Sequence, residues 1–329
     1  MFDKITHTVL TGDDVRSVLK KDELFYTISW IEAVRRGFEA EIMAVLTSFH
    51  GDNVLLGIYF ILDKGVIKLA GSPLSGTFTP YLDLIWNKEL NSDQKREVFL
   101  EQFKYLKKLG FSHIEYKFSN FKEAKFFSDL DNFELSQKET YILDMEKSLD
   151  ELWSGFSNEC KESIREALKN RVEVEKIEAC ELDVEDFYDI LKVLYEKKGE
   201  RPRHSLKFFK EIVYRMQTDN KLLFQRAVLN NQIISMKIYI FDRKKFFYLC
   251  DASLDIAYET KAVYLMHWYS IKFARDLGVK YYDFNSKGDS LSNPVKRSFS
   301  PKIYERGSLL YRSAITKSAE TLYRKITKK

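Results

Sequence analysis

Cysteine, proline and glycine are all scarce in this chain of 329 residues, which has 3 cysteines, 5 prolines and 13 glycines. Cys160, Cys180 and Cys250 lie far apart, so neither a disulfide framework nor the paired spacing of a zinc site is present. An odd number of cysteines fits a reducing compartment. Few prolines and glycines exclude a collagen-like or low-complexity chain. We therefore expect a folded protein without a metal.

Long apolar runs are missing as well. No stretch approaches about 18 uninterrupted apolar residues, which a membrane-spanning helix would need. The first residues, Met1-Phe2-Asp3-Lys4, lack the basic start and apolar run of a signal peptide. The expected location is therefore the cytoplasm.

Charge of one sign does not dominate the chain. The sequence has 53 basic and 49 acidic residues, a net charge of +4, and both signs are interspersed. This balance does not indicate a DNA-binding protein. Only the segment from Tyr311 to Lys329 is clearly basic.

That basic segment has the pattern of an amphipathic helix. An apolar stripe lies opposite its lysines and arginines and consists of Tyr311, Ile315, Leu322 and Ile326. The stripe could pack on the second domain, or it could hold the protein against an anionic membrane surface. The second alternative would make the protein membrane-peripheral.

What is present is a regular alternation of helical and strand-like segments in a chain long enough for two domains. In the first half we expect helices near 26–36 and 93–108, and strands near 41–49, 53–62, 66–70 and 113–118. In the second half we expect helices near 149–153, 159–170, 183–198, 205–216 and 260–277, and strands near 172–177, 222–229, 232–241, 246–252 and 280–284. Asn230-Asn231 predicts a hairpin turn.

An internal echo connects the two halves. Leu109-Gly110 and Leu277-Gly278 are 168 residues apart, and each follows a helical segment and precedes a strand. At this offset His113-Ile114-Glu115-Tyr116 matches Tyr281-Tyr282-Asp283-Phe284. A helix, a glycine and a strand also follow one another by chance in many α/β proteins. The alternative is a duplication, in which two domains share one fold.

Three stretches of the second half carry a resemblance to a known family. One begins with Phe156-Ser157-Asn158 and ends with Val172-Glu173-Val174, and a closer match begins with His267-Trp268 and ends with Tyr282-Asp283-Phe284. The third consists of Gly288-Asp289 and Val295-Lys296-Arg297-Ser298-Phe299. These stretches resemble FemAB/FemX-like transferases and the related cellulose-biosynthesis-type GNAT proteins of polysaccharide gene clusters, and the third is similar to the family's last element.

The resemblance implies an α/β (α+β) protein made of two tandem GNAT-like domains. Each would be a mixed, mostly antiparallel sheet flanked by helices, with residues 1–145 in the first domain and 146–329, including the basic C-terminal helix, in the second. The implied activity is direct transfer of an acyl or aminoacyl group to an amine or hydroxyl. The acceptor would be a cell-envelope or polysaccharide precursor, either a small molecule or a lipid- or nucleotide-linked glycan.

Two residues are the catalytic candidates. Lys296 matches a lysine of the family's last element and could stabilise an oxyanion, although it could equally be a solvated lysine. Asp283 lies among large aromatic residues, which could raise the pKa of its carboxyl group and make it a general base. A structural carboxylate at the end of a strand is the alternative. No arrangement for covalent catalysis is present.

The substrate-binding candidates lie in several segments. Arg201 and Arg203 form a compact basic cluster that could clamp phosphates of a nucleotide-linked acceptor or of tRNA. The resemblance places the acyl group near residues 246–252 and the acceptor near Thr79-Pro80-Tyr81. The remaining candidates are Tyr81, Tyr248, Asp251, Trp268 and Asp289. Core packing is the alternative for Trp268 and for its neighbour His267.

One departure from the GNAT pattern bears on the donor. A GNAT domain normally binds the coenzyme A pyrophosphate with a glycine-rich loop at a helix N-terminus. The corresponding stretch, 253–262, contains no glycine and carries Asp255 and Glu259. The donor could therefore be acyl-CoA or aminoacyl-tRNA. A catalytically degenerate tandem GNAT that only binds a glycan precursor or a partner protein is the competing hypothesis.

Overall fold

The computed structural model describes residues 5–19, 22–287 and 292–327 and divides them into two compact units. Unit 1 comprises residues 1–20, 38–138 and 305–329, and unit 2 comprises residues 21–37 and 139–304. The chain therefore passes between the units several times. The sequence suggested one contiguous division at residue 145. Two segments differ from that expectation, because 21–37 belongs to unit 2 and 305–329 to unit 1.

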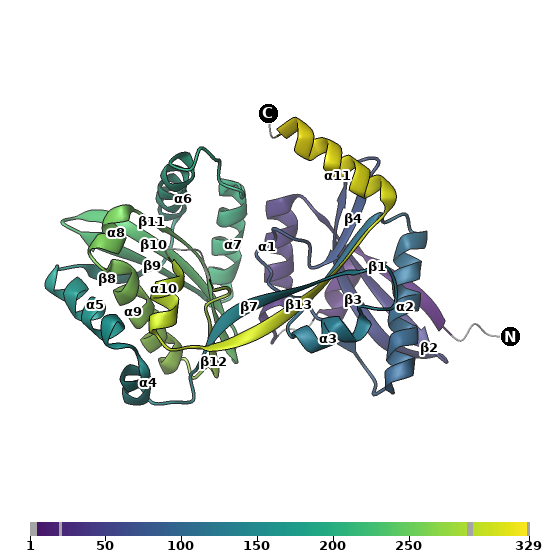
Figure 1. The fold of residues 1–329 in the computed structure, drawn as a ribbon, viewed down its shortest axis with the longest axis horizontal. Coiled ribbons are helices and arrows are strands. Elements are labelled where there is room, and N and C mark those ends of the chain that lie inside the picture. Colours follow the sequence, from purple (N-terminus) through teal and green to yellow (C-terminus); the bar gives the residue numbers. More distant parts are fainter. Residues whose placement is uncertain (1–4, 20–21, 288–291, 328–329) are drawn as a thin grey trace. The chain divides into compact units, whose positions relative to one another are not determined.

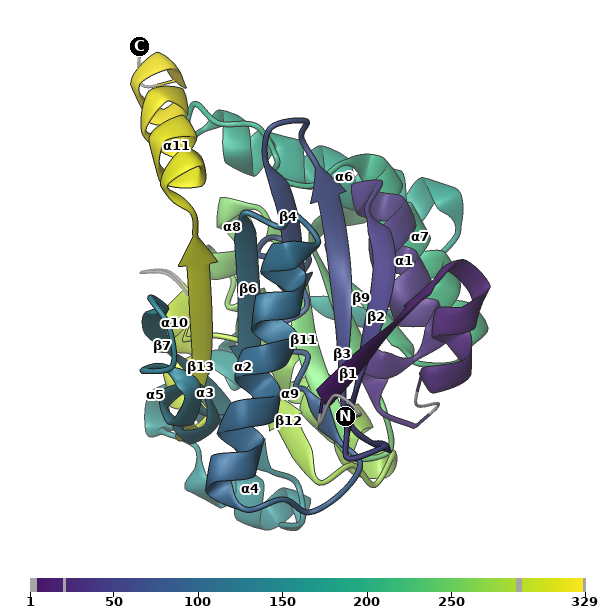
Figure 2. The same cartoon turned by 90° about the vertical axis from the view of Figure 1, so that its right-hand side faces the viewer.

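Unit 1 is a mixed sheet with helices on one face. Its strands follow the order β1-β2-β3-β4-β6-β13, and only the β4–β6 pair is parallel. Figure 2 shows α2 lying across this sheet. The elements are β1 (Ile5–Thr11), η1 (Gly12–Val18), β2 (Glu41–Phe49), β3 (Asp52–Asp63), β4 (Lys68–Ser72), β5 (Ile85–Trp86), α2 (Ser92–Lys108), β6 (His113–Phe118), α3 (Phe121–Phe127), β13 (Lys302–Arg312) and α11 (Ala314–Thr327).

Unit 2 also has a mixed sheet with a single parallel strand pair, but helices cover both faces of this sheet. Its strands follow the order β7-β12-β11-β10-β9-β8, and only the β11–β12 pair is parallel. Figure 1 shows its elements. They are η2 (Leu24–Tyr26), α1 (Ile28–Phe38), β7 (Glu134–Asp144), α4 (Leu149–Gly155), α5 (Asn158–Lys169), β8 (Glu173–Ile177), α6 (Glu181–Glu196), α7 (Leu206–Thr218), β9 (Leu222–Leu229), β10 (Gln232–Phe241), β11 (Lys245–Ser253), α8 (Asp255–Glu259), α9 (Ala262–Asp276), β12 (Tyr281–Asp283) and α10 (Ser292–Ser298).

Alternating side chains of the unit 2 strands supply a core on each face. On one face Phe246 and Tyr282 join the core beneath α5 and α9. On the other face Phe224 contacts Phe187 of α6, which in turn contacts Phe209 of α7. A sheet that is covered on both faces keeps its interior dry, which matters for the polar side chains described below.

The internal echo corresponds to equivalent elements in the two units. Helix α2 precedes β6, helix α9 precedes β12, and each of these strands is the parallel partner in its own sheet. Gly110 (φ 90°) and Gly278 (φ 73°) both take the left-handed conformation that ends a helix. The predicted hairpin is also confirmed, with Asn230 and Asn231 at φ 48° and 62°. The two units therefore share one fold.

Helix α11 packs on unit 1, not on the second domain as the sequence suggested. Thr316 is 1% exposed, and its hydroxyl donates to the Ser112 carbonyl at 3.0 Å. Tyr311, just before the helix, packs against the unit 1 core, whereas Ile315 is 61% exposed. The side chains of Leu322 and Ile326 lie outside the described ones. Contact of this helix with a membrane stays a prediction.

Candidate active site

The two parallel strands of unit 2 separate halfway along β11. Strand β12 pairs with residues 245–247 of β11 and ends at Asp283, whereas β11 continues to Ser253. A register shift at Ile238/Tyr239 of β10 places Leu249 in a β-bulge where the separation begins. We call residues 248–253 of β11 together with 284–286, which follow β12, the strand divergence. Where two neighbouring strands separate, backbone N–H and C=O groups are left without a strand partner, and a ligand can bind to them and to the nearby side chains.

A network of hydroxyl groups holds Asp251 at the strand divergence. The Tyr248 hydroxyl donates to Asp251 Oδ1, and the Ser253 hydroxyl donates to Oδ2 at 2.7 Å. Ser235 on β10 extends the network through its 2.7 Å contact with the Ser253 hydroxyl. Asp251 is half-buried while Tyr248, Ser253 and Ser235 are buried. The carboxylate is thus fixed in orientation and still reachable.

Lys296 on α10 reaches the same place from the other strand. Its Nζ lies 3.2 Å from both the Phe284 and the Ser286 carbonyl oxygens and 3.4 Å from the Ser286 hydroxyl. The same nitrogen is 4.9 Å from the centre of the Tyr248 ring. Lys296 is 3% exposed. The structure therefore brings the predicted residues Tyr248, Asp251 and Lys296 together.

A second buried lysine, Lys237, was missed by the sequence analysis. It lies opposite Asp251 in the β10–β11 register, is 1% exposed, and its Nζ is 5.4 Å from the Tyr248 ring centre. Its hydrogen bond is to the Val263 carbonyl at 3.3 Å. Burial lowers the pKa of Lys237 to about 8, against the raising effect of Asp251, while the charge of Lys296 lowers it further. The signal in the sequence was a lysine inside the apolar run Ile233–Tyr239.

His267 of α9 lies beneath this cluster as a neutral side chain. Its Nδ1 is 3.1 Å from the Tyr282 hydroxyl, which is also 2.9 Å from the Ser270 hydroxyl. Burial, assisted by the charges of Lys237 and Lys296, holds the pKa of His267 well below 6.5. Burial also raises the pKa of Tyr282. The helix therefore contributes hydrogen-bonding groups without charge.

Asp283 is buried at the end of β12 with its carboxylate engaged. Its Oδ1 accepts from the Thr140 hydroxyl and from the Asn285 backbone N–H, both at 2.7 Å. These bonds tie β7 to the chain that leaves β12. The residue is 1% exposed, and both bonds hold its carboxylate in place at the end of the strand. Its role as general base stays a prediction.

The other predicted substrate residues lie elsewhere. Trp268 packs against Trp153 and Phe156, with ring centres 5.1 and 5.6 Å away. Arg201 and Arg203 are exposed between α6 and α7. Tyr81, in unit 1, is 7% exposed and lies 5.2 Å from the Arg306 guanidinium. Asp289 lies outside the described residues. Substrate binding by these residues stays a prediction.

The glycine-free stretch of unit 2 forms a short helix. Residues 255–259 make α8, and Lys261, at φ 63°, turns the chain into α9. Asp255 pairs with Lys197, the residue after α6, at 2.5 Å. A carboxylate thus lies beside the turn where a glycine-rich loop would bind phosphate in an ordinary GNAT domain.

In unit 1 the equivalent strand separation is filled by the chain itself. Strands β4 and β6 stop pairing at Ser72 and Tyr116. The segment that follows β4 rejoins β6 through a 3.1 Å bond from the Leu82 N–H to the Lys117 carbonyl. Glu115 accepts from the Ser75 backbone N–H at 2.6 Å and from its hydroxyl at 2.5 Å. No comparable segment crosses the described residues of the strand divergence in unit 2.

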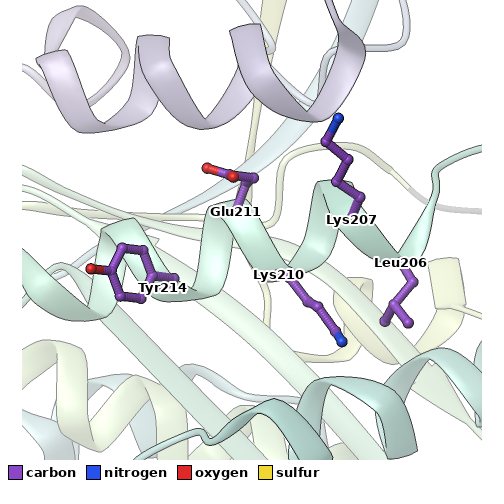
Figure 3. A pocket seen from close by; sticks show the side chains of 5 residues that line it. All are labelled: Leu206, Lys207, Lys210, Glu211 and Tyr214. Atoms are coloured by element: carbon purple, nitrogen blue, oxygen red, sulfur yellow. The ribbon is translucent and has the colours of Figure 1, made fainter.

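A shallow surface hollow lies away from these groups, along α7 (Figure 3). In Figure 3 Lys207 and Glu211 point to one side of the helix and Lys210 to the other. Lys210 pairs with Glu181 and Glu185 of α6. Tyr214 is 69% exposed. All the lining residues belong to one helix, and none of them is among the groups gathered at the strand divergence.

No cluster of three or more metal-ligating side chains occurs in the part of the chain that the structure describes. Within the same residues no helix is long and apolar enough to span a bilayer.

Residues 154–291 match a family model described as an acetyltransferase (GNAT) domain. The solved structure of FemX covers 98% of this chain and 99% of its own at a TM-score of 0.63 and 14% identity. The chain has a FemX-like tandem GNAT fold. A tandem GNAT protein from the clavulanic acid biosynthesis pathway is similar at a TM-score of 0.57, with 8% identity over 93% of this chain and 98% of its own.

A third similar structure is the C-terminal domain of a protein named as a lysylphosphatidylglycerol synthetase from Agrobacterium fabrum. It has a TM-score of 0.55 and 10% identity over 93% of this chain and 94% of its own. No curated protein sequence matches the chain. At these identities the similarities establish the fold. The strand divergence of unit 2, residues 248–253 and 284–286, lies within residues 154–291, the stretch that matches the GNAT domain model. Its polar groups are therefore the candidates for an active site.

Proposed function

We propose that the protein transfers an acyl or aminoacyl group directly from its donor to an amine, or a hydroxyl, of a cell-envelope or polysaccharide precursor. The observation that supports this function is the strand divergence of unit 2. There a parallel strand pair opens at a bulge, and Tyr248, Asp251 and Lys296 gather beside it. The match of residues 154–291 to a GNAT acetyltransferase domain adds support.

Asp251 suits the role of proton acceptor for the attacking amine. Its two oxygens are held by the Tyr248 and Ser253 hydroxyls, so the carboxylate is oriented before the substrate binds. Each carboxylate oxygen has a further lone pair for an incoming N–H. The family position of Lys296 suggests that an ammonium group stabilises the oxyanion at this place, and Asp283 would hold the chain around it.

The reaction would proceed without a covalent enzyme intermediate. The acceptor nitrogen attacks the carbonyl carbon of the donor, and the carbonyl electrons move to oxygen. The nitrogen loses its proton to Asp251. When the carbonyl forms again, the bond to the thiol sulfur or ribose oxygen breaks, and this leaving group takes up the proton that Asp251 had accepted, which restores the carboxylate. The protein contributes orientation and charge stabilisation in a dry site.

The donor is the open part of this proposal. A GNAT domain favours acyl-CoA, whereas the aspartate-bearing α8 stands where a phosphate loop is usual. The similarity to FemX and to a lysylphosphatidylglycerol synthetase supports aminoacyl-tRNA. We place the enzyme in the cytoplasm with a glycan acceptor, and contact of α11 with a membrane surface belongs to the same proposal.

Thermal stability tests the donor. Acetyl-CoA and lysyl-tRNA are each added to the full chain at increasing concentration while the melting temperature is measured. A ligand at about 100 times its Kd stabilises the folded state by about 2.7 kcal/mol. We expect one of the two to raise the melting temperature. If neither does so at saturation, and neither is consumed in the presence of an amine, the transferase proposal is wrong.

A second candidate function is binding without catalysis, which the absent glycine-rich loop favours. In that case the protein would hold a glycan precursor or a partner protein. Loss of transfer in Lys296→Ala, with an unchanged circular dichroism spectrum, would exclude this alternative.

A further inference from the structure

The two buried lysines at the strand divergence differ in how their ammonium groups are used. Lys296 has three acceptors within 3.4 Å, two of them carbonyl oxygens of the chain that leaves β12. An ammonium group has three N–H donors. Lys296 therefore already has an acceptor for each donor and ties residues 284–286 to α10. We expect Lys296 to hold the backbone of residues 284–286 in place beside the site.

Lys237 uses its ammonium group far less. Of its three donors, one is occupied by the Val263 carbonyl at 3.3 Å. The carboxylate it faces, Asp251, is committed to the Tyr248 and Ser253 hydroxyls. Keeping such a charge in a dry interior is costly without good partners. A group that appears only during the reaction would supply the missing partner.

We propose that Lys237 donates hydrogen bonds to the oxyanion that forms on the donor carbonyl, the role that family position assigns to Lys296. This inference rests on the proposed transfer function. A donor that gains its partner only in the transition state lowers the barrier without tightening substrate binding. Lys237 and Lys296 lie 5.4 and 4.9 Å from the same Tyr248 ring, so either can reach the divergence.

Lys237 gives up no proton in this role. The acceptor nitrogen bonds to the carbonyl carbon, the carbonyl electrons settle on oxygen, and two N–H groups of Lys237 bind that oxygen. The proton of the amine goes to Asp251. As the carbonyl forms again, the sulfur or oxygen of the leaving group departs with the bonding electrons and takes the proton from Asp251, which becomes a carboxylate again. Lys237 returns to its starting state.

This role requires Lys237 to be charged, so activity should fall at alkaline pH. The groups that face it are Asp251 and Tyr248 of β11, Lys296 of α10 and His267 of α9. The pKa of Tyr248 is raised and that of His267 is lowered, both by burial, so neither titrates near pH 8. Since the pKa of Lys237 is lowered to about 8, the alkaline limb should lie there.

The test compares Lys237→Met, Lys237→Arg and Lys296→Met in the full chain. The donor is whichever of acetyl-CoA and lysyl-tRNA raises the melting temperature, and hydroxylamine is the acceptor amine. For Lys237→Met we expect kcat to fall about 100-fold with little change in KM. Lys237→Arg keeps its charge, so it should recover part of the rate and lose the alkaline limb. Lys296→Met should change KM and the melting temperature together.

Lys117→Met is the matched control, because Lys117 is a half-buried lysine of unit 1 whose pKa is also lowered by burial. Its transfer rate should stay within about twofold of the natural protein. A measurement without substrate follows Lys237 directly, by titrating isotope-labelled lysine in nuclear magnetic resonance spectra. One lysine signal that titrates near pH 8 should vanish in Lys237→Met.

The outcomes separate this inference from the function it rests on. A natural protein that transfers from neither donor overturns both. An active natural protein whose Lys237→Met variant keeps its rate and its alkaline limb overturns the role of Lys237 alone. A Lys237 signal that titrates near the ordinary lysine value overturns the predicted alkaline limb, and the kcat of Lys237→Met then decides the role by itself.

Discussion

At the scale of single residues, the candidate site is a carboxylate surrounded by neutral donors and two buried ammonium groups. Tyr248 and Ser253 hold Asp251, and Lys237 faces it across the strand pair. Each of these groups is buried or half-buried. Polar groups are retained in a dry interior only when they are satisfied, so the arrangement is sensitive to single substitutions.

Asp251→Asn should show whether the Asp251 side chain acts as a proton acceptor or only fills its place in the site. The amide keeps the size of the side chain but cannot take up a proton from the acceptor amine, so we expect transfer to slow by about 10²-fold or more. Asp276→Asn, at an exposed aspartate at the end of α9, is the control and should retain the rate. Initial rates at saturating donor decide the matter. Equal rates in both variants would remove Asp251 from the mechanism.

His267 makes a prediction about acid stability. Its folded pKa lies well below 6.5 because of burial, so the unfolded chain binds more protons than the folded one as pH falls below 6.5. The free energy of unfolding should therefore fall by up to about 1.4 kcal/mol per pH unit from this group. In His267→Gln, urea titrations at about pH 6.5 and 5 should show a smaller decrease.

His50→Gln serves as the reference, since His50 is exposed. Its decrease should equal that of the natural protein. His7, whose pKa is also lowered by burial, keeps a share of the acid dependence in every variant. An unchanged slope in His267→Gln would show that His267 is protonated in the folded state.

At the scale of helices and strands, the sequence predicted most elements of unit 2 and the tandem repeat. Helix α9 carries a long apolar face and ends at Gly278, and the hairpin at Asn230-Asn231 has residues that favour a left-handed backbone. These signals are local. Pairing of residues 307–312 with β6 was not predictable, because it joins segments far apart in the chain and no local pattern specifies the partner.

The site was predicted only in part for the same reason. Resemblance supplied Lys296 and the segment 246–252, in which Tyr248 and Asp251 were candidates. Lys237 was missed because a lysine in a strand usually reads as a solvent-facing residue, and only the two-sided cover of the sheet makes it buried. Ser235 and Ser253 were missed because their contact depends on the register between β10 and β11.

Gly307 of strand β13 packs closely against helix α3, so the addition of a single methyl group at this position should disturb the packing. A Cβ added at Gly307 would overlap the Cβ of Ala124 in α3 and come within 3.1 Å of the Phe121 Cα. Gly307→Ala should therefore destabilise the protein by about 1–3 kcal/mol through overpacking. Gly155→Ala is the control, because nothing lies within 4 Å of its added Cβ. Chemical denaturation of both variants measures the difference, and equal midpoints would contradict the packing of β13 on α3.

At the scale of the whole molecule, each unit contains a segment from the other half of the sequence. Residues 21–37 belong to unit 2, where Phe25 contacts Phe247 with ring centres 4.9 Å apart. Residues 305–329 belong to unit 1, where β13 completes the sheet beside β6 and buries Leu309. Neither half of the chain contains a complete unit.

Removal of residues 305–329 should therefore unfold unit 1, although the other strands of unit 1 lie near the beginning of the chain. A chain that ends at residue 304 loses the strand beside β6 and leaves an open sheet edge, which favours aggregation. A chain that ends at residue 319 keeps β13 and the buried Thr316 and should remain folded. Hydrogen exchange of β6 peptides distinguishes the two. Protected β6 amides in the shorter chain would contradict the assignment of β13.

The assignment of residues 21–37 to unit 2 and of residues 305–329 to unit 1 also determines the order in which the two units can fold during synthesis. Domains usually fold in the order in which they leave the ribosome, with the N-terminal domain first. Here the first strands to emerge, β1 to β6, wait for residues 307–312, which are synthesised only after the whole of unit 2. Unit 2 is complete by residue 304. Unit 2 can thus finish folding first, and the sheet of unit 1 must remain open until unit 2 has been made.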